Sequence, residues 1–145
     1  MEGMEKGQKE SLMASTHTLF GFINVSATAA PYVVILLYSI AGSFLTLAWF
    51  FHLKLPADWK WWAYIAVSWG FFALFEYIFA NQATRLGHLG GYFTVGQLKT
   101  IQITTAIIAY LIFSYIALNE KITLYHIGGF GLIALGAGLV FTAPK

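Results

Sequence analysis

The sequence predicts an all-α membrane protein with four transmembrane helices arranged as two hairpins, preceded by an N-terminal extension. Two observations predict this fold class. Of the 145 residues, 59% are hydrophobic and 10% are charged, with a mean hydropathy of +0.71, whereas soluble domains carry about 25% charged residues. Four apolar stretches also match the roughly 20 residues that a helix needs to cross a bilayer. These stretches are continuous rather than alternating, which favours helices over barrel strands.

The four predicted spans cover about 32–51, 61–80, 100–119 and 122–143, within a transmembrane domain of residues 29–145. The first and third spans are uncharged, the second contains Glu76, and the fourth has His126 near its start. Tryptophans flank the 52–60 connection, as expected at a headgroup interface. Residues 119–121 form a tight turn, which predicts an antiparallel hairpin. The glycine-rich 81–99 segment is expected to be a long, flexible loop between the hairpins.

Residues 1–28 are predicted to form a polar and amphipathic extension. The first ten residues alternate between Lys and Glu among small residues, which favours a solvated segment. The apolar residues that follow are interrupted by polar ones, and this favours an interfacial helix or an arm that docks on a partner. They are Leu12, Leu19, Phe20, Phe22, Ile23 and Val25.

The numbers of positive charges near the spans do not determine which side of the protein faces the cytoplasm. Four spans place the 81–99 connection and the C-terminus on one side, with three nearby cations: Arg85, Lys99 and Lys145. The opposite side also has three: Lys54, Lys60 and Lys121. The positive-inside rule therefore gives no firm orientation.

Glu76 is the most informative residue in the chain, because it is the only formal charge within the predicted spans. A carboxylate inside a membrane helix costs roughly 2.5–3.5 kcal/mol on insertion scales. Glu76 could bind a cation or a proton during transport. It could instead pair with Arg85 or Lys99, since it lies only about a turn before the predicted end of its span, or it could simply be exposed at the interface.

Helical spacing places Trp69, Phe72, Ala73 and Ala80 on the same face as Glu76. An aromatic wall beside a carboxylate suits a lipophilic cation. On the third helix, Lys99 and Gln102 begin a polar stripe that favours hydrogen bonding between helices, and Gln102 could also orient Glu76.

Small residues recur along one face of the fourth helix, and such a face allows a second helix to approach closely in lipid. They are Gly128, Gly131, Ala134 and Gly138. The partner helix could belong to the same chain or to another subunit.

Several functional classes are excluded by the residues present. With no cysteine, the chain has no thiolate nucleophile and no Cys-ligated metal. The four histidines lack metal-ligand spacing, so no metal site is predicted, although His52 or His126 could be a lone axial ligand to a haem or a chlorin. Neither a G-x-S-x-G elbow nor a phosphate-binding loop is present. We therefore expect no enzyme activity, no resident cofactor and, at a net charge of +2, no nucleic-acid partner.

Three segments together resemble a small four-helix bacterial family labelled "DMT family protein". They are 44–54 (FLTLAWFFHLK), 68–86 (SWGFFALFEYIFANQATRL) and 93–102 (FTVGQLKTIQ). The family is an uncharacterised branch of the drug/metabolite transporter superfamily, and the resemblance extends over about residues 35–142. The matching motif positions are Trp49, His52, Lys54, Trp69, Glu76, Tyr77, Arg85, Gln97, Lys99 and Gln102.

This chain departs from the family pattern in two places. The arginine is approached by N-Q-A-T where a P-A-N-like sequence is expected, and Ile103 stands where an acid usually follows the Ile-Gln pair. The related small multidrug resistance transporters carry their essential carboxylate in the first helix. Since no acid lies between Glu10 and Asp58, their mechanism does not transfer to this chain.

The resemblance implies a small-molecule or cation exporter in the bacterial inner membrane. Because four helices enclose little space for a substrate pathway, we expect the exporter to act as a homodimer. The expected substrate-binding residues are Glu76, Trp69, Trp49 and Gln102, and the expected ion-pair or gating residues are Arg85, Lys99 and His52. The alternative is a non-catalytic accessory subunit of a larger, pigment- or cofactor-bearing membrane complex. The missing acid at Ile103 and the N-terminal arm favour this alternative.

Overall fold

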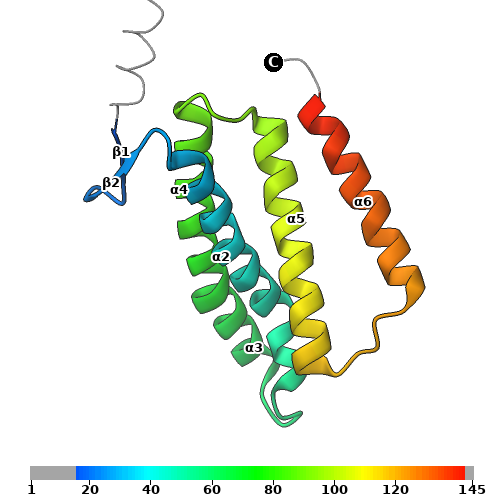
Figure 1. Cartoon of the computed structure of the whole chain (residues 1–145). Helices are drawn as coiled ribbons and strands as arrows, with labels where there is room; N and C mark the ends of the chain where they lie inside the picture. Colours follow the sequence, from blue (N-terminus) through cyan, green and yellow to red (C-terminus); the bar gives the residue numbers. More distant parts are fainter. Residues whose placement is uncertain (1–15, 143–145) are drawn as a thin grey trace, which may run out of the picture.

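The computed structural model describes residues 16–142, which form one β-hairpin followed by four long helices (Figure 1). The first long helix is α2 (Ala30–Phe50), which ends in a 3-10 turn (Phe51–Lys54). The second consists of α3 (Trp61–Val67), a π-helical turn (Ser68–Ala73) and α4 (Leu74–Leu89). The third is α5 (Val95–Phe113), extended by a π-helical turn (Ser114–Leu118), and the fourth is α6 (Leu124–Thr142).

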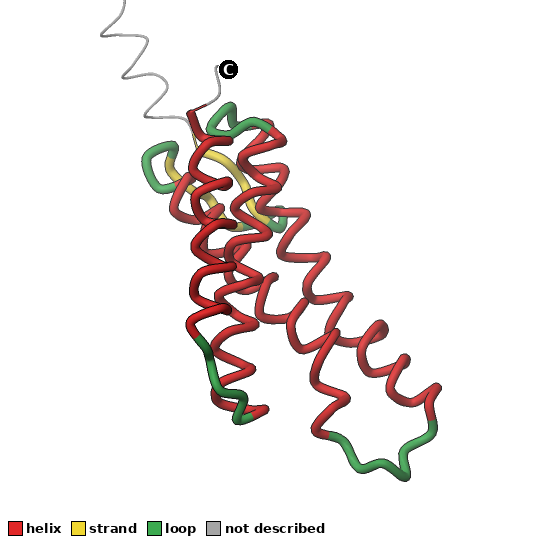
Figure 2. Tube along the Cα trace, turned by 90° about the vertical axis from the view of Figure 1, so that its right-hand side faces the viewer, coloured by secondary structure: helices red, strands yellow, loops and turns green. Residues whose placement is uncertain are grey.

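Each of these four helices is long and apolar enough to cross a membrane. The all-α fold class with four spans is therefore confirmed. The two hairpins lie close together at their upper ends, and their loop ends, at 55–60 and 119–123, lie apart (Figure 2).

The second span is longer than the sequence predicted, because α4 continues to Leu89 instead of ending near Ala80. Ala83, Leu86 and Gly87 are buried in the C-terminal part of this helix. Their packing stabilises the helical conformation of residues 81–89, although this segment contains polar residues and a glycine. The connection to α5 is consequently residues 90–94 rather than a long flexible loop.

A capping box fixes the start of α5. The Gln97 backbone N–H donates to Thr94 Oγ1 at 3.3 Å, and the Thr94 backbone N–H donates to Gln97 Oε1 at 3.0 Å. These two bonds satisfy backbone donors that a helix start leaves free.

Helix α2 is the centre of the bundle, since it packs against both α4 and α5. Its buried residues include Val34, Tyr38 and Ala41. The Tyr38 hydroxyl lies 2.7 Å from Thr84 Oγ1 on α4, and the Tyr38 carbonyl oxygen accepts from Thr105 Oγ1 on α5 at 3.1 Å. One residue thus joins three helices through hydrogen bonds.

The closest backbone approach involves Gly42 of α2. A Cβ at this position would lie 2.9 Å from the backbone nitrogen of Ala106 and 3.0 Å from its Cα. Only glycine fits here without moving α5, and this is the close packing by which helices associate in lipid.

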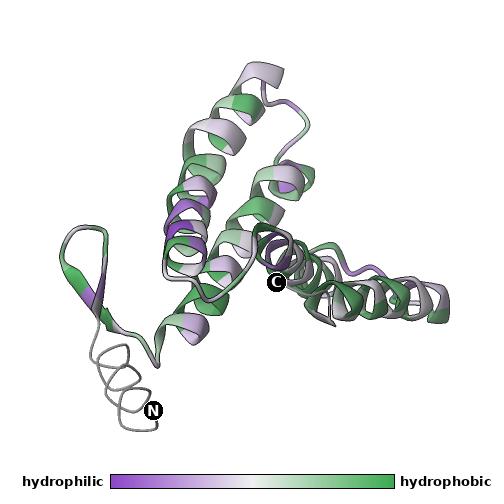
Figure 3. Cartoon of the chain, turned by 90° about the horizontal axis from the view of Figure 1, so that it is seen from above, coloured by the Kyte–Doolittle hydropathy of each residue, from purple (hydrophilic) through white to green (hydrophobic). Residues whose placement is uncertain are grey.

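Helix α6 stands largely apart from the other helices. Within the described residues it contacts the bundle near its C-terminal end, where Phe141 meets Phe93 edge-to-face with centroids 6.5 Å apart. The second hairpin is therefore open at its turn, a difference from the tight pair expected from residues 119–121. From above, the part of the chain leading to the C-terminus is mainly hydrophobic and lies to one side (Figure 3).

The N-terminal segment forms a β-hairpin where the sequence suggested an interfacial helix. Strands β1 (Thr16–Leu19) and β2 (Ile23–Ser26) pair antiparallel, with Leu19 opposite Ile23. The INVS segment alternates apolar and polar residues, and this alternation is a strand signal. Leu19 and Val25 are buried in the core, so the described part of this arm folds onto its own chain. The remainder of the predicted 1–28 extension lies outside the described residues.

The close approach at Gly42 makes a testable prediction. Gly42→Leu should lower the free energy of unfolding by about 1–3 kcal/mol, because the added side chain overpacks the α2–α5 contact. Unfolding in detergent, followed by circular dichroism, measures this change. Gly129→Leu is the matched control, since a Cβ at Gly129 would meet nothing within 4 Å in the described structure. Equal stability of the two variants would contradict the packing.

Candidate functional site

A groove with a volume of about 790 Å³ lies between α2 and the helix that runs from Trp61 to Leu89. Most of its wall is apolar, and five aromatic side chains contribute to it: Trp49, Trp61, Tyr64, Trp69 and Tyr77. Trp69 is 77% exposed, so a bound molecule could cover it. The aromatic content gives the groove large, flat contact surfaces for an apolar or aromatic ligand.

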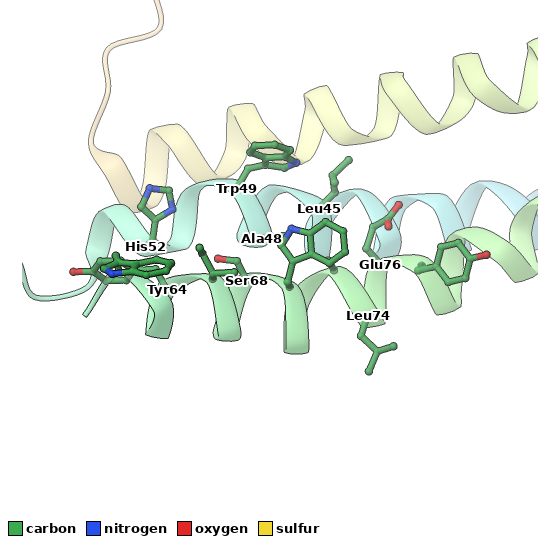
Figure 4. A pocket seen from close by; sticks show the side chains of 13 residues that line it. Leu45, Ala48, Trp49, His52, Tyr64, Ser68, Leu74 and Glu76 are labelled. Atoms are coloured by element: carbon green, nitrogen blue, oxygen red, sulfur yellow. The ribbon is translucent and has the colours of Figure 1, made fainter. Parts of the chain in front are cut away.

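The polar groups of the groove are separated along its length. His52 and Tyr64 lie at one end, and Glu76 lies toward the other (Figure 4). The Tyr64 hydroxyl donates to the Pro56 carbonyl oxygen at 2.9 Å, so part of its hydrogen-bonding capacity is already used. Glu76 is the only acidic residue in the groove wall. The expected residues Trp49, Trp69, His52 and Glu76 therefore line one common groove.

The π-helical turn (Ser68–Ala73) changes which residues face the groove. A π turn adds one residue to the ordinary helical repeat, so side chains on its two sides lose their regular spacing. Ala73 shares the groove with Trp69 and Glu76, as expected. Phe72, which was expected there, instead meets Phe51 with ring centroids 5.3 Å apart, and Ala80 is buried in the core.

Glu76 is linked to α5 through an amide. Gln102 Nε2 donates to Glu76 Oε1 at 3.3 Å, and Lys99 Nζ donates to Gln102 Oε1 at 3.1 Å. The Gln102 amide therefore donates a hydrogen bond to the Glu76 carboxylate and accepts one from the Lys99 ammonium group. This geometry determines the orientation of the Gln102 side chain and holds the carboxylate beside α5.

The direct ion pair considered from the sequence is not formed. Within residues 16–142, neither Arg85 nor Lys99 forms a direct ion pair with Glu76, and Arg85 is exposed. The helix that contains Glu76 extends to Leu89, beyond the apolar sequence that ends near Ala80. Glu76 lies fifteen residues after Trp61 and thirteen before Leu89, near the middle of the helix rather than near its end.

A second, smaller groove of about 260 Å³ lies between α2 and α5. Lys99, Gln102 and Ile103 contribute to its wall, so the position that lacks the family's acid faces this groove. Leu45 and Trp49 line both grooves. The hydrogen bond from Gln102 to Glu76 thus connects residues of the two grooves, while Trp49 forms part of the partition between them.

The histidines do not converge. Within the described range, no group of three His, Cys, Asp or Glu residues could hold a metal ion. His17 Nε2 lies 3.0 Å from the Tyr92 hydroxyl, and His126 Nδ1 accepts from the Thr123 backbone N–H at 3.1 Å. His52 lies at the end of the larger groove.

The small-residue face of α6 meets nothing in the described chain. A Cβ added at Gly128, Gly131 or Gly138 would have no neighbour within 4 Å there. In the described structure, these glycines therefore do not pack against another helix of the same chain.

The Glu76–Gln102 bond makes a second prediction. Gln102→Leu should lower the free energy of unfolding by about 1–3 kcal/mol, because the partly buried carboxylate loses its hydrogen-bond donor. Arg85→Ala is the control and should change stability by less than about 0.5 kcal/mol, as expected for a surface site. Thermal unfolding in detergent measures both changes. If Arg85→Ala restored stability to a Glu76→Ala variant, the two residues would form an ion pair and the present geometry would be wrong.

The chain matches a known protein family. Residues 33–141 match the family described as "Putative member of DMT superfamily (DUF486)". No curated protein and no solved structure matches the chain. Because the family match covers most of the 145 residues, the chain belongs to this family of the DMT superfamily and is a transporter-like, multi-pass integral membrane protein.

Proposed function

We propose that the protein exports small organic cations, with the aromatic groove as the substrate site and Glu76 as the residue that binds the cation or the coupling proton. The observation that carries this proposal is the single carboxylate within an otherwise largely apolar, aromatic groove. Its place in a helix long and apolar enough to cross a membrane further supports it, since ionisable residues inside membrane helices commonly mark ion and substrate pathways.

The lining residues suggest how such a cation would be held. Trp49 and Trp69 supply indole faces, which attract cations by about 0.5–2 kcal/mol each depending on exposure. Glu76 supplies the opposite charge. Gln102 keeps the carboxylate oriented, because its donor is directed at Glu76 and its acceptor at Lys99.

The cationic residues have proposed secondary roles. Lys99 is connected to Glu76 only through the Gln102 amide, so loss of the Gln102 contact would release both charged groups. His52, at the other end of the groove, is a candidate gating residue. Arg85 is exposed and lies beyond the groove, so it is a weaker candidate than the sequence suggested.

A flux measurement tests the proposal. Purified protein in proteoliposomes should accumulate tetraphenylphosphonium when a proton gradient is imposed, and Glu76→Gln should abolish this flux. The amide has nearly the same shape as the carboxylate, but it carries no charge and no transferable proton. The melting temperature of Glu76→Gln in detergent should remain close to that of the natural chain, so that lost flux is not lost folding.

Asp58→Asn is the matched control, because it makes the same chemical change in an exposed loop. Its flux should be unchanged. Normal flux in a folded Glu76→Gln variant would remove the carboxylate from the mechanism. Absence of flux and of tetraphenylphosphonium binding in the natural chain would contradict this substrate class.

The proposed working form is a homodimer in the bacterial inner membrane. The α6 face formed by Gly128, Gly131, Ala134 and Gly138 supports an assembly, because small residues permit close packing with a helix of a second copy. The alternative is an accessory subunit of a larger complex. Exposure of α6 is compatible with both, but the described part of the N-terminal arm packs on its own bundle and no longer favours the alternative.

Native mass in a mild detergent, recorded together with visible absorbance, separates these assemblies. We expect a dimer without pigment, and we expect Gly131→Leu to shift it toward monomer because the larger side chain blocks close helix packing. Gly70→Leu is the control, since Gly70 lies outside α6 and has no neighbour within 4 Å of an added Cβ in the described structure. Reproducible co-purification with large unrelated subunits would instead favour the accessory role.

A further inference from the structure

The β-hairpin of residues 16–26 has two chemically different faces. Leu19 and Val25 turn toward the bundle and are buried. Thr18, Asn24 and Ser26 are exposed on the other face, where Thr18 Oγ1 donates to Asn24 Oδ1 at 3.1 Å. The hairpin therefore has one face suited to the protein core and one face suited to water.

The tip of the hairpin is held by specific contacts. Phe20 and Gly21 both have positive φ angles, of 52° and 81°. Such a φ is unfavourable for phenylalanine, and the Phe20 contacts help to maintain it. The Phe20 backbone N–H donates to Gln82 Oε1 at 3.4 Å, and its ring lies edge-to-face with Phe79, with centroids 6.1 Å apart.

Two apolar residues at the tip are exposed. Phe22 is 77% exposed and Ile23 is 43% exposed within the described structure. Phe22 has a loose ring contact with Phe20, at a centroid distance of 6.4 Å. Phe22 is thus exposed in the turn, while Ile23 lies opposite Leu19, on the same face as Val25, and is partly exposed at the tip.

The hairpin lies at the end of the bundle where α2 begins and α4 becomes polar, which is where we expect the headgroup region. It lies beside the upper parts of α2 and α4, next to the start of α2 at Ala30 (Figures 1 and 2). Its contacts on α4 are Phe79 and Gln82, where the apolar sequence of that helix gives way to polar residues. Exposed Tyr32, in the first turn of α2, is a typical interfacial side chain.

We propose that Phe22 and Ile23 insert into the bilayer at the boundary between headgroups and acyl chains, and that they anchor the hairpin to the lipid surface. A lipid occupant fits better than a protein partner because only two apolar residues are displayed. A stable protein interface buries about 800 Å² on each side, whereas one aromatic residue buries about 150–250 Å². The polar face beside the tip stays toward water in this arrangement.

The natural absence of cysteine allows a direct test by spin labelling. Phe22→Cys and the control Asn24→Cys each create a single thiol in the full chain. The spin-labelled proteins are reconstituted in phosphatidylethanolamine–phosphatidylglycerol vesicles, and collisions of the label with oxygen and with a water-soluble nickel chelate are measured. Oxygen concentrates in the acyl region and the chelate in water. The oxygen-to-nickel collision ratio should be several-fold higher at position 22 than at position 24.

Two results would overturn the proposal. Equal ratios at both positions would place the tip in water. Low accessibility to both reagents at position 22 would mean that protein, such as a second copy, covers the tip. Phe22→Ser, monitored by thermal unfolding in detergent, checks folding and should melt as the natural chain does, because the ring is largely exposed. If Phe22→Cys did not fold, Ile23→Cys would provide the same measurement, with the same expected ratio.

Discussion

The arrangement of the helices depends on the close contact between α2 and α5 at Gly42. Because a Cβ there would meet the Ala106 backbone at 2.9 Å, the two helix backbones nearly touch. Helix α2 also packs against α4, where a Cβ at Gly87 would lie 3.5 Å from Val34 Cγ1. In lipid there is no hydrophobic force that drives helices together, so close packing and hydrogen bonds must hold the bundle. The three-helix arrangement around α2 meets this requirement, whereas α6 does not take part in it.

This packing also determines where polar groups can lie. Tyr38 directs its hydroxyl to Thr84 and receives the Thr105 hydroxyl at its carbonyl oxygen, so polar atoms between α2, α4 and α5 are paired. Glu76 follows the same rule through Gln102 of α5. The larger groove, between α2 and the 61–89 helix, has aromatic walls and contains Glu76 as its single acid. Helix α2 thus contributes both to a closely packed interface and to a groove that has room for a ligand.

The sequence predicted the number and type of the spans because each apolar run is long and continuous. It missed the end of α4, since Asn81, Gln82 and Arg85 resemble a loop and only the tertiary contacts of Ala83 and Leu86 show a helix. It also missed the hairpin, although the alternation in INVS was readable. The groove residues could be named individually from the motifs. Their common location depends on the packing of α2 against the π turn and α4, which has no clear sequence signal.

The surroundings of Glu76 favour a role beyond packing. A carboxylate inside a membrane helix costs up to roughly 2.5–3.5 kcal/mol, while one hydrogen bond to a neutral donor recovers about 1 kcal/mol. Within residues 16–142, Glu76 accepts a hydrogen bond from Gln102 and has no direct ion pair. This single bond therefore offsets only part of the cost of the carboxylate. A ligand or proton that binds Glu76 from the aromatic groove accounts for the residue better than a structural role does.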